Sequence, residues 1–146
     1  MSYDLVIKNG TVVDGSGSAR YRADVAITDG KIAKIGRVNE KSKQTIDAEG
    51  HVVSPGFVDG HTHMDAQVFW DPIGSCSSYH GVTSVVMGNC GFTLAPCKQE
   101  DADLVFRNLE RAEDLSRDAM LEGIDWTWET FPEFLDAVDD LPKGIN

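Results

Sequence analysis

Basic residues and long apolar runs are scarce in this chain of 146 residues. Thirteen lysines and arginines stand against 24 aspartates and glutamates, and the net charge of −11 repels phosphate backbones and anionic lipid heads. We therefore expect neither nucleic acid nor a membrane as a partner. No stretch approaches the roughly 18 consecutive apolar residues of a membrane helix, and residues 1–4 lack the features of a signal peptide. These absences predict a cytoplasmic protein.

Cysteine is also rare, and its number is odd. Cys76, Cys90 and Cys97 cannot pair off into a disulfide framework, so we expect reduced thiols and, at some position, thiolate chemistry. The composition, with 41% hydrophobic and 25% charged residues, is that of an ordinary globular domain. A complete (β/α)8 barrel needs about 250 residues. Any barrel signal in this chain must therefore belong to an incomplete barrel.

Residues 1–56 are predicted to form short strands separated by turns. Asn9-Gly10, Asp14-Gly15 and Asp29-Gly30 supply the positive φ angles of tight turns, which predicts antiparallel hairpins. The expected strands are 5–8, 11–13, 24–27, 31–35, 44–47 and 51–54. Such a sheet leaves one apolar face that must pack on something.

Beyond residue 56 the pattern changes to that of a βαβ unit. A strand is expected at 57–61, and the nearly continuous apolar run 82–87 suits a parallel strand buried on both faces. The spacing leaves room for a crossover helix within 67–79.

Two helices are predicted in the last third of the chain. Apolar residues three to four positions apart indicate a helix over 105–115. Thr130 and Glu133 form a capping box at the start of the second helix, and Lys143-Gly144 ends it.

The chemistry-bearing pattern is His61-Thr62-His63, at the end of the strand that begins at residue 57. Alternate side chains of a strand share a face, so His61 and His63 can bind one metal ion, with Asp59 one pleat below them. A bare His-x-His motif is weak evidence by itself, because an exposed pair after a strand is commonly part of a turn.

Three longer stretches resemble a known family. Residues 46–63, which end in Pro-Gly-Phe-Val-Asp-Gly-His-Thr-His, resemble the start of an amidohydrolase-superfamily protein. Residues 81–96, with the turn Gly-Asn-Cys-Gly, resemble strand 2 of the N-acyl-D-amino-acid deacylase (D-aminoacylase) branch, as do residues 122–135. The resemblance implies an α/β chain with an all-β N-terminal part. A small β-sandwich segment over 1–56 would lead into the first strands and helices of a metal-dependent (β/α)8 TIM barrel over 57–146.

The resemblance also implies a site and a reaction. His61, His63 and Cys90 would be ligands of a zinc ion (Zn2+), and metal-activated water would hydrolyse the amide bond of a small N-acyl amino acid. In the family the general base is an aspartate on the last barrel strand, which would fall beyond residue 146. We therefore name no catalytic base in this chain and expect the isolated, truncated chain to be inactive.

Other interpretations stay open. A cyclic-amide hydrolase of the hydantoinase or dihydropyrimidinase kind would belong to the same superfamily but usually lacks the cysteine ligand. A non-catalytic fragment would keep the three residues without a working site. An unclosed barrel would also expose two sheet edges, so a homo-oligomer is one expected form.

The remaining polar candidates receive structural interpretations. His51 and His80 are expected to be structural or to face solvent, and Cys76 and Cys97 to be small apolar or surface thiols. Asp65 could hold a loop or a ligand, and a solvated loop carboxylate is an equal alternative.

The aromatic and acidic residues of the C-terminal third are likewise assigned to structure. The acidic run 110–118, which includes Glu113, is expected to be a solvated helix face. Core packing is favoured over an acyl-binding pocket for four aromatic residues, which are Trp126, Trp128, Phe131 and Phe134.

Overall fold

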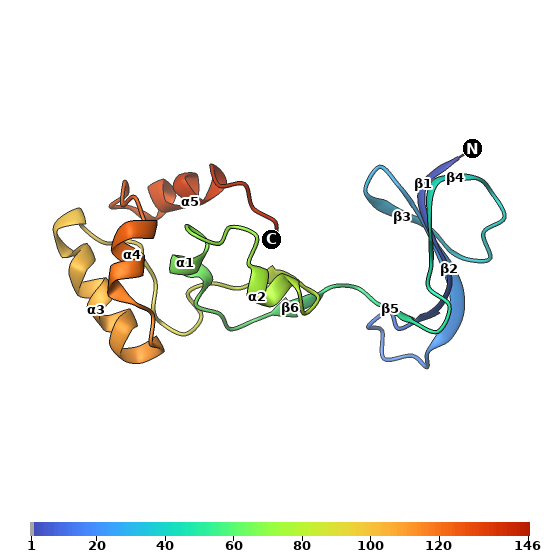
Figure 1. Cartoon of the computed structure of the whole chain (residues 1–146), viewed down its shortest axis with the longest axis horizontal. Helices are drawn as coiled ribbons and strands as arrows, with labels where there is room; N and C mark the ends of the chain where they lie inside the picture. The colour runs from blue at the N-terminus through green and yellow to red at the C-terminus, as the bar shows by residue number, and fades with distance from the viewer. Residues whose placement is uncertain (1) are drawn as a thin grey trace. The chain divides into compact units, whose positions relative to one another are not determined.

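The structure is a computed structural model that describes residues 2–146, and its chain divides into two compact units. Unit 1 comprises residues 1–55 and unit 2 comprises residues 56–146. Figure 1 shows a sheet in the first and a small helix-rich assembly in the second. Each unit has its own buried apolar cluster and is described separately.

Unit 1 is a five-stranded mixed sheet centred on β1 (Tyr3–Val12). On one side, β1 pairs antiparallel with β2 (Tyr21–Thr28), which pairs antiparallel with β3 (Lys31–Gly36). On the other side, β4 (Ser42–Asp47) and β5 (Val52–Val53) both pair parallel with β1. Strands are therefore present at all the predicted places, although 5–8 and 11–13 belong to the single strand β1, and the antiparallel pattern extends only from β1 to β3.

The predicted turn at Asn9-Gly10 is wrong, because β1 continues through it. Asn9 has a φ of 62°, and the pairing register of β1 against β2 shifts between Ile7 and Gly10. The backbone N–H of Asn9 donates to Asp24 Oδ1 at 2.9 Å, which satisfies this group where the pairing is irregular. A Cβ atom at Gly10 would lie 2.5 Å from Val53 Cγ2. The dipeptide therefore makes an irregularity within one strand and a close approach to β5.

The core of unit 1 is small. Val6, Ala26 and Val38 are almost fully buried and contact one another, with Tyr3 packed against them. Ile32 and Ile35 are exposed, and they help to line an open apolar hollow of about 360 Å³ on the sheet. No second sheet covers this face within residues 2–55, so the described part of unit 1 is a single sheet rather than a sandwich.

Unit 2 begins with the predicted βαβ arrangement. β6 (Phe57–Asp59) and β7 (Val82–Val85) pair parallel, and the crossover contains two single-turn helices, α1 (Met64–Gln67) and α2 (Ser75–Ser78). The expectation that the second strand is buried on both faces is wrong, because Thr83 is exposed and the other residues of β7 are only half-buried. Phe57 and Val58 of β6 are 63% and 70% exposed.

The rest of unit 2 is helical. A short 3₁₀ turn, η1 (Gln99–Asp101), leads into α3 (Ala102–Glu113), which confirms the first predicted helix. A second helix, α4 (Arg117–Gly123), was not predicted; Ser116 accepts from the backbone N–H of Ala119 at its start. α5 (Phe131–Asp139) begins with the predicted capping box between Thr130 and Glu133 but ends at Asp139, short of the predicted Lys143-Gly144.

Stacked aromatic rings form the core of unit 2. The rings of Trp126 and Trp128 lie 4.8 Å apart, and Phe69 stacks on Trp128 at 5.0 Å. The Trp128 indole N–H donates to the carbonyl of Leu94 at 2.9 Å, so the ring is buried without losing its hydrogen bond. Core packing is confirmed for Trp126, Trp128 and Phe134, whereas Phe131 is 49% exposed.

The helices of the described residues are short and polar on one side. None is both long and apolar enough to span a lipid bilayer.

Candidate metal centre

Two loops of unit 2 carry the predicted ligands, and side-chain hydrogen bonds hold these loops together. Thr62 Oγ1 donates to the carbonyl of Val86 at 3.1 Å, and Asn89 Nδ2 donates to the carbonyl of Gly60 at 2.7 Å. The first loop follows β6 and the second follows β7. Because β6 and β7 are parallel neighbours, their C-terminal ends lie at the same edge of the sheet.

His61 and His63 do not lie on a strand, which corrects the predicted extent of β6. The strand ends at Asp59, whose Oδ1 accepts from the backbone N–H of His61 at 3.1 Å. This local hydrogen bond turns the chain, and His63 becomes the residue that precedes α1. Asp59 therefore shapes the loop that bears both histidines.

The second loop is a tight turn around Cys90. Gly88 and Gly91 have φ angles of 76° and 90°, and the backbone N–H of Gly91 donates to the carbonyl of Gly88 at 3.1 Å. Residues with a side chain rarely adopt such angles, so glycine on both sides of the cysteine segment is a requirement of this turn.

The structure brings His61, His63 and Cys90 together. One ring nitrogen from each histidine and the Cys90 sulfur all lie within 4.8 Å of one another. His61 is exposed, while His63 and Cys90 are half-buried, so the group is open to solvent on one side. Two imidazoles and one thiol are the donor types that zinc prefers.

The two nitrogens of His63 have different surroundings. Nε2 lies 3.2 Å from Glu113 Oε2, at the end of α3. Nδ1 is buried and has no hydrogen-bond partner among the described residues. A buried ring nitrogen without a partner is costly, and a cation bound through it would remove that cost. The surroundings of His63 therefore fit a metal ligand.

Asp65 is buried, which decides between its two interpretations. It is 4% exposed, in the first turn of α1, so it is not a solvated loop carboxylate. Burial raises the pKa of Asp65 above its usual value, and nearby His63 and backbone hydrogen bonds oppose this rise. Asp65 adds a buried carboxyl group beside the three candidate ligands.

The residues given structural interpretations lie outside the group. His51 and His80 are exposed, as expected; His51 Nδ1 contacts the carbonyl of Glu49 at 3.0 Å. Cys76 is exposed. Cys97 is half-buried, and burial raises the pKa of its thiol.

Glu113 is the residue of this site that sequence reasoning missed. It belongs to the acidic run that was expected to face solvent, yet it is half-buried and contacts His63. The spacing of apolar residues in α3 does not indicate this contact. The contact depends on how α3 packs against the loop that bears His63.

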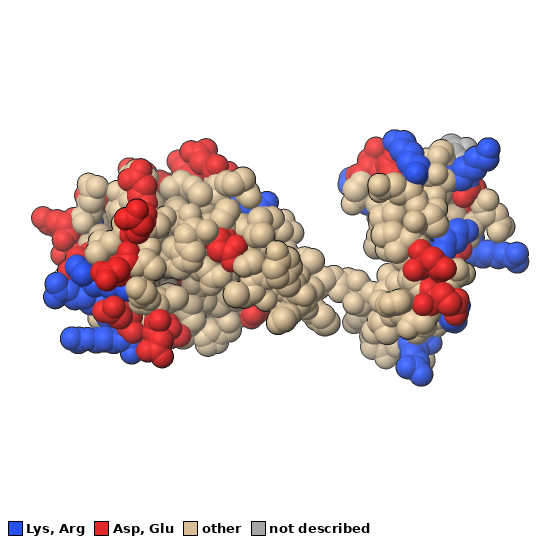
Figure 2. All heavy atoms as spheres, viewed as in Figure 1, with Lys and Arg blue, Asp and Glu red and all other residues tan. Residues whose placement is uncertain are grey.

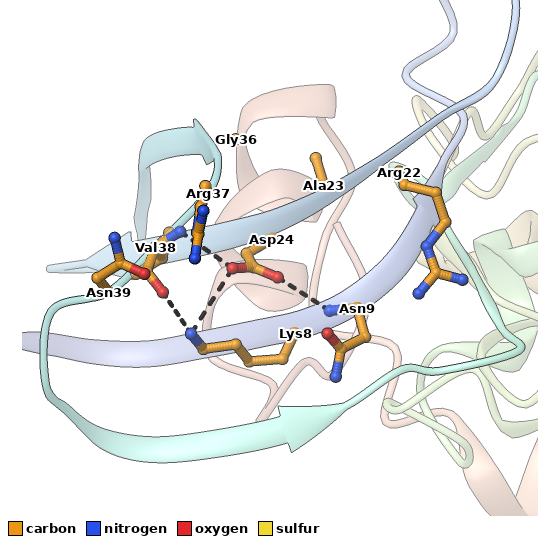
Figure 3. Close-up of a pocket in the computed structure, with 9 residues that line it drawn as sticks. All are labelled: Lys8, Asn9, Arg22, Ala23, Asp24, Gly36, Arg37, Val38 and Asn39. Carbon is orange, nitrogen blue, oxygen red and sulfur yellow. Dashed lines mark hydrogen bonds and ion pairs between the residues drawn. The ribbon is translucent and has the colours of Figure 1, made fainter.

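Unit 1 contains a polar hollow of about 340 Å³, shown in Figure 3. Asp24 lies at its centre, where it accepts from the backbone N–H groups of Asn9 and Val38 and lies 3.6 Å from Lys8 Nζ. Lys8 Nζ also donates to the carbonyl of Val38. These polar groups satisfy one another, which is typical of a structural network rather than a ligand site.

Comparison with protein families gives matches over both units. Residues 44–145 match the amidohydrolase family, and residues 1–57 match the N-terminal domain of the urease alpha-subunit. The first match contains all three candidate ligands.

Individual relatives cover the whole chain. An uncharacterised protein of Mycobacterium tuberculosis is 38% identical over 100% of this chain and 24% of its own length. The D-aminoacylase of Alcaligenes xylosoxydans xylosoxydans is 36% identical over 99% of this chain and 28% of its own length. The chain thus spans about a quarter of the length of these relatives.

A solved structure shows the same fold. The N-acyl-D-glutamate deacylase of Bordetella bronchiseptica, crystallised with zinc and a phosphonate mimic of the tetrahedral intermediate, superposes with a TM-score of 0.78 at 31% identity. The match covers 100% of this chain and 28% of that protein.

Proposed function

Because this chain belongs to the amidohydrolase family, we propose that it is part of a zinc-dependent hydrolase that cleaves the amide bond of N-acyl-D-amino acids. His61, His63 and Cys90 would hold the zinc ion. The observation that carries this proposal is the approach of their three donor atoms to within 4.8 Å of one another. The deacylase names of two relatives support the choice of substrate class.

The donor set favours zinc over the hard cations. Thiolate and imidazole ligands suit zinc, whereas Mg²⁺ and Ca²⁺ prefer oxygen. Zinc supplies Lewis acidity when bound, which polarises an amide carbonyl and lowers the pKa of bound water toward about 7.

The residues of this chain would contribute binding and orientation. Cys90 would bind as a thiolate, which places one negative charge in the site. Asp59 and Thr62 hold the histidine loop in place through the contacts described above. The proton transfers of hydrolysis need a positioned carboxylate. We expect that group beyond residue 146, and we expect little turnover from residues 1–146 alone.

The cysteine also separates this proposal from the cyclic-amide alternative. Enzymes that cleave hydantoins or dihydropyrimidines would use the same two histidines but usually no cysteine ligand. A thiol within reach of both imidazoles therefore favours the deacylase branch.

The two units would have different roles in this protein. We propose that residues 1–56 are part of a β-sandwich and that residues 57–146 are the start of the catalytic barrel, in which β6 and β7 are the first two strands. Their C-terminal ends would carry the site, as is usual for barrels of this kind.

Zinc binding by the 146-residue chain tests the site directly. We expect one zinc ion per chain, measured by competition with a chromophoric chelator. Cys90→Ala should weaken zinc binding by at least about 100-fold, since it removes a ligand rather than a supporting group. Cys76→Ala is the matched control and should leave the affinity unchanged. Equal zinc affinity of the Cys90→Ala and unsubstituted chains would refute the proposed ligand set.

Hydrolysis is tested on the complete gene product that contains this chain. Release of free amino acid from N-acetyl-D-amino acids is compared with release from the L enantiomers and with ring opening of hydantoin. Preference for the D enantiomer supports the proposal, and ring opening without deacylation favours the cyclic-amide alternative. Zinc binding without either activity would favour a non-catalytic role.

A further inference from the structure

We propose that Asn89 is a positioning residue that holds Cys90 beside the two histidines. Its side-chain amide joins the loop that bears Cys90 to the loop that bears His61 and His63. This inference rests on the proposed zinc site and adds to it a residue that would act through Cys90 rather than bind the metal itself.

The hydrogen bond of Asn89 lies next to candidate ligands at both of its ends. Asn89 Nδ2 donates to the carbonyl of Gly60 at 2.7 Å. Asn89 directly precedes Cys90 in the chain, and Gly60 directly precedes His61. The bond is therefore a short link between the backbone that carries the thiol and the backbone that carries the first imidazole.

The other hydrogen bond between the two loops has a different position. Thr62 is buried, and its Oγ1 donates to the carbonyl of Val86 at 3.1 Å. Val86 directly follows β7, so this bond joins the histidine loop to the end of the strand. The chain then passes through the turn at Gly88 before it reaches Cys90. The position of the thiol therefore depends on what restrains that turn.

Packing does not restrain the glycines of this turn. Gly88 and Gly91 have φ angles of 76° and 90°, and glycine has the largest backbone freedom of any residue. A Cβ atom at either position would meet nothing within 4 Å among the described residues beyond the adjoining chain. The side-chain amide of Asn89 supplies a restraint that packing does not.

This restraint matters for metal binding because order in the free site lowers the cost of binding. A thiol on a loose turn loses conformational freedom when it becomes a ligand, whereas a thiol already held in place does not. Asn89 is exposed, so its hydrogen bond adds little to the buried core of unit 2. We therefore expect its loss to affect the site much more than the fold.

Zinc affinity of the full 146-residue chain provides the first test, measured by competition with a chromophoric chelator. Asn89→Ala removes the donor to Gly60, and we expect zinc binding to weaken by about 10-fold, as is typical for loss of a supporting group. Asn108→Ala is the matched control, because this residue is exposed on α3, and it should leave the affinity unchanged. Circular dichroism of the zinc-free chains checks that each variant is folded.

Combining Asn89→Ala with Cys90→Ala separates a positioning role from a structural one. His61 and His63 lie on the same loop, so Asn89 has no ligand to position once the thiol is removed. We expect the double variant to bind zinc as weakly as Cys90→Ala alone, measured with a chelator of lower affinity. A further loss in the double variant, as large as that caused by Asn89→Ala in the unsubstituted chain, would indicate a structural role and overturn the proposal.

Proton exchange of the Asn89 side-chain amide tests the hydrogen bond itself and needs no variant. The signals in a ¹⁵N-labelled chain are assigned through the dipeptide Asn89-Cys90, which occurs once in the sequence. In the zinc-free chain we expect the Nδ2 protons of Asn89 to exchange with water more slowly than those of exposed Asn108. Equal exchange at the two side chains would overturn the proposal, whether or not Asn89→Ala folds.

The outcomes separate this inference from the proposed function. If the unsubstituted chain binds no zinc, the proposed site fails and this inference fails with it. If that chain binds zinc, Cys90→Ala weakens binding and Asn89→Ala does not, the ligand set stands and the role of Asn89 alone is refuted. Equal weakening in Asn89→Ala and Asn108→Ala would also refute the specific role.

Discussion

The two units of this chain differ sharply in charge. Unit 1 has eight basic and seven acidic residues, which leaves +1, whereas unit 2 has five and 17, which leaves −12. Figure 2 shows the acidic side chains spread over unit 2 and the two signs mixed on unit 1. The acidity of the whole chain is therefore a property of unit 2, the unit that contains the candidate metal centre.

The units also differ in whether their buried polar groups have hydrogen-bond partners. In unit 1, Asp24 and Lys8 are satisfied by backbone groups and by each other. In unit 2, the Nδ1 atom of His63 is buried and has no hydrogen-bond partner within residues 2–146, and the same side chain lies close to a thiol and a second imidazole. The comparison teaches that the polar network of unit 1 is satisfied internally, while unit 2 keeps one buried ring nitrogen unpaired among the described residues.

Trp128→Ala tests whether the two units are stabilised separately. Trp128 is 1% exposed in the aromatic core, so its loss should reduce the free energy of unfolding of unit 2 by about 4 kcal/mol. All three tryptophans lie in unit 2, so fluorescence of the remaining two follows its denaturant unfolding.

Hydrogen exchange in β1 and β2 reports on unit 1 in the same variant. We expect the protection of these amides to be unchanged. A parallel loss of protection would show that the units unfold as one, and the comparison would then be wrong. Phe131→Ala, at a half-exposed ring of unit 2, is the control and should have a much smaller effect.

Asp24→Ala removes the centre of the polar network in unit 1. Two backbone N–H groups lose their acceptor and Lys8 loses its ion pair, so we expect a loss of about 2 kcal/mol in the unfolding free energy of unit 1. Hydrogen exchange of β1 amides measures it. Glu40→Gln, which breaks an exposed ion pair with Lys34, should have a much smaller effect, because solvent screens such pairs.

The same network predicts how unit 1 responds to acid. Burial opposes ionisation of Asp24, but hydrogen bonds from Asn9 and Val38 and the charge of Lys8 outweigh it and lower its pKa below the usual value. Since the folded-state pKa is depressed, the stabilisation is present above the usual aspartate range and is lost as the pH falls through the folded-state pKa. Asp24→Ala should therefore show a shallower loss of unit 1 stability on acidification than the unsubstituted chain.

Thr130→Ala should have a smaller effect than Trp128→Ala or Asp24→Ala, and we expect this effect only in unit 2. It removes the side-chain oxygen that accepts from the backbone N–H of Glu133 in the capping box of α5, which should cost about 1 kcal/mol. Denaturant unfolding followed by tryptophan fluorescence measures this loss. Thr127→Ala, at an exposed position before the cap, should change the midpoint little.

Much of the fold could be predicted because its signals are local. The Asp29-Gly30 turn, the βαβ pattern and the capping box at Thr130 each depend on a few neighbouring residues. The prediction at Asn9-Gly10 failed because a distant partner decides: the dipeptide has the sequence of a hairpin turn but is held within a strand by Asp24. No pairing was predicted for β4, because its parallel contacts with β1 are not encoded in a local pattern.

The residues of the candidate site likewise divide into those that local motifs predict and those that depend on packing. His61, His63 and Cys90 could be named from short motifs, and their convergence follows from strands β6 and β7 being neighbours. The burial of Asp65 and the contact of Glu113 with His63 could not be predicted, because both depend on packing around the first turn of α1 and the end of α3. The role of the three candidate ligands stays a prediction until metal binding is measured.

The backbone hydrogen bonds of Asn146 restrict where a label can be attached to this chain. Its N–H donates to the carbonyl of Thr83 at 3.0 Å, and its carbonyl accepts from the N–H of Val85 at 2.8 Å, so it is bonded to β7 like a further strand. An affinity tag or dye attached at Asn146 would disturb these hydrogen bonds to β7, the strand that precedes Cys90. Labels are better placed in the exposed segment 14–20 of unit 1, where a bulky group would disturb no pairing.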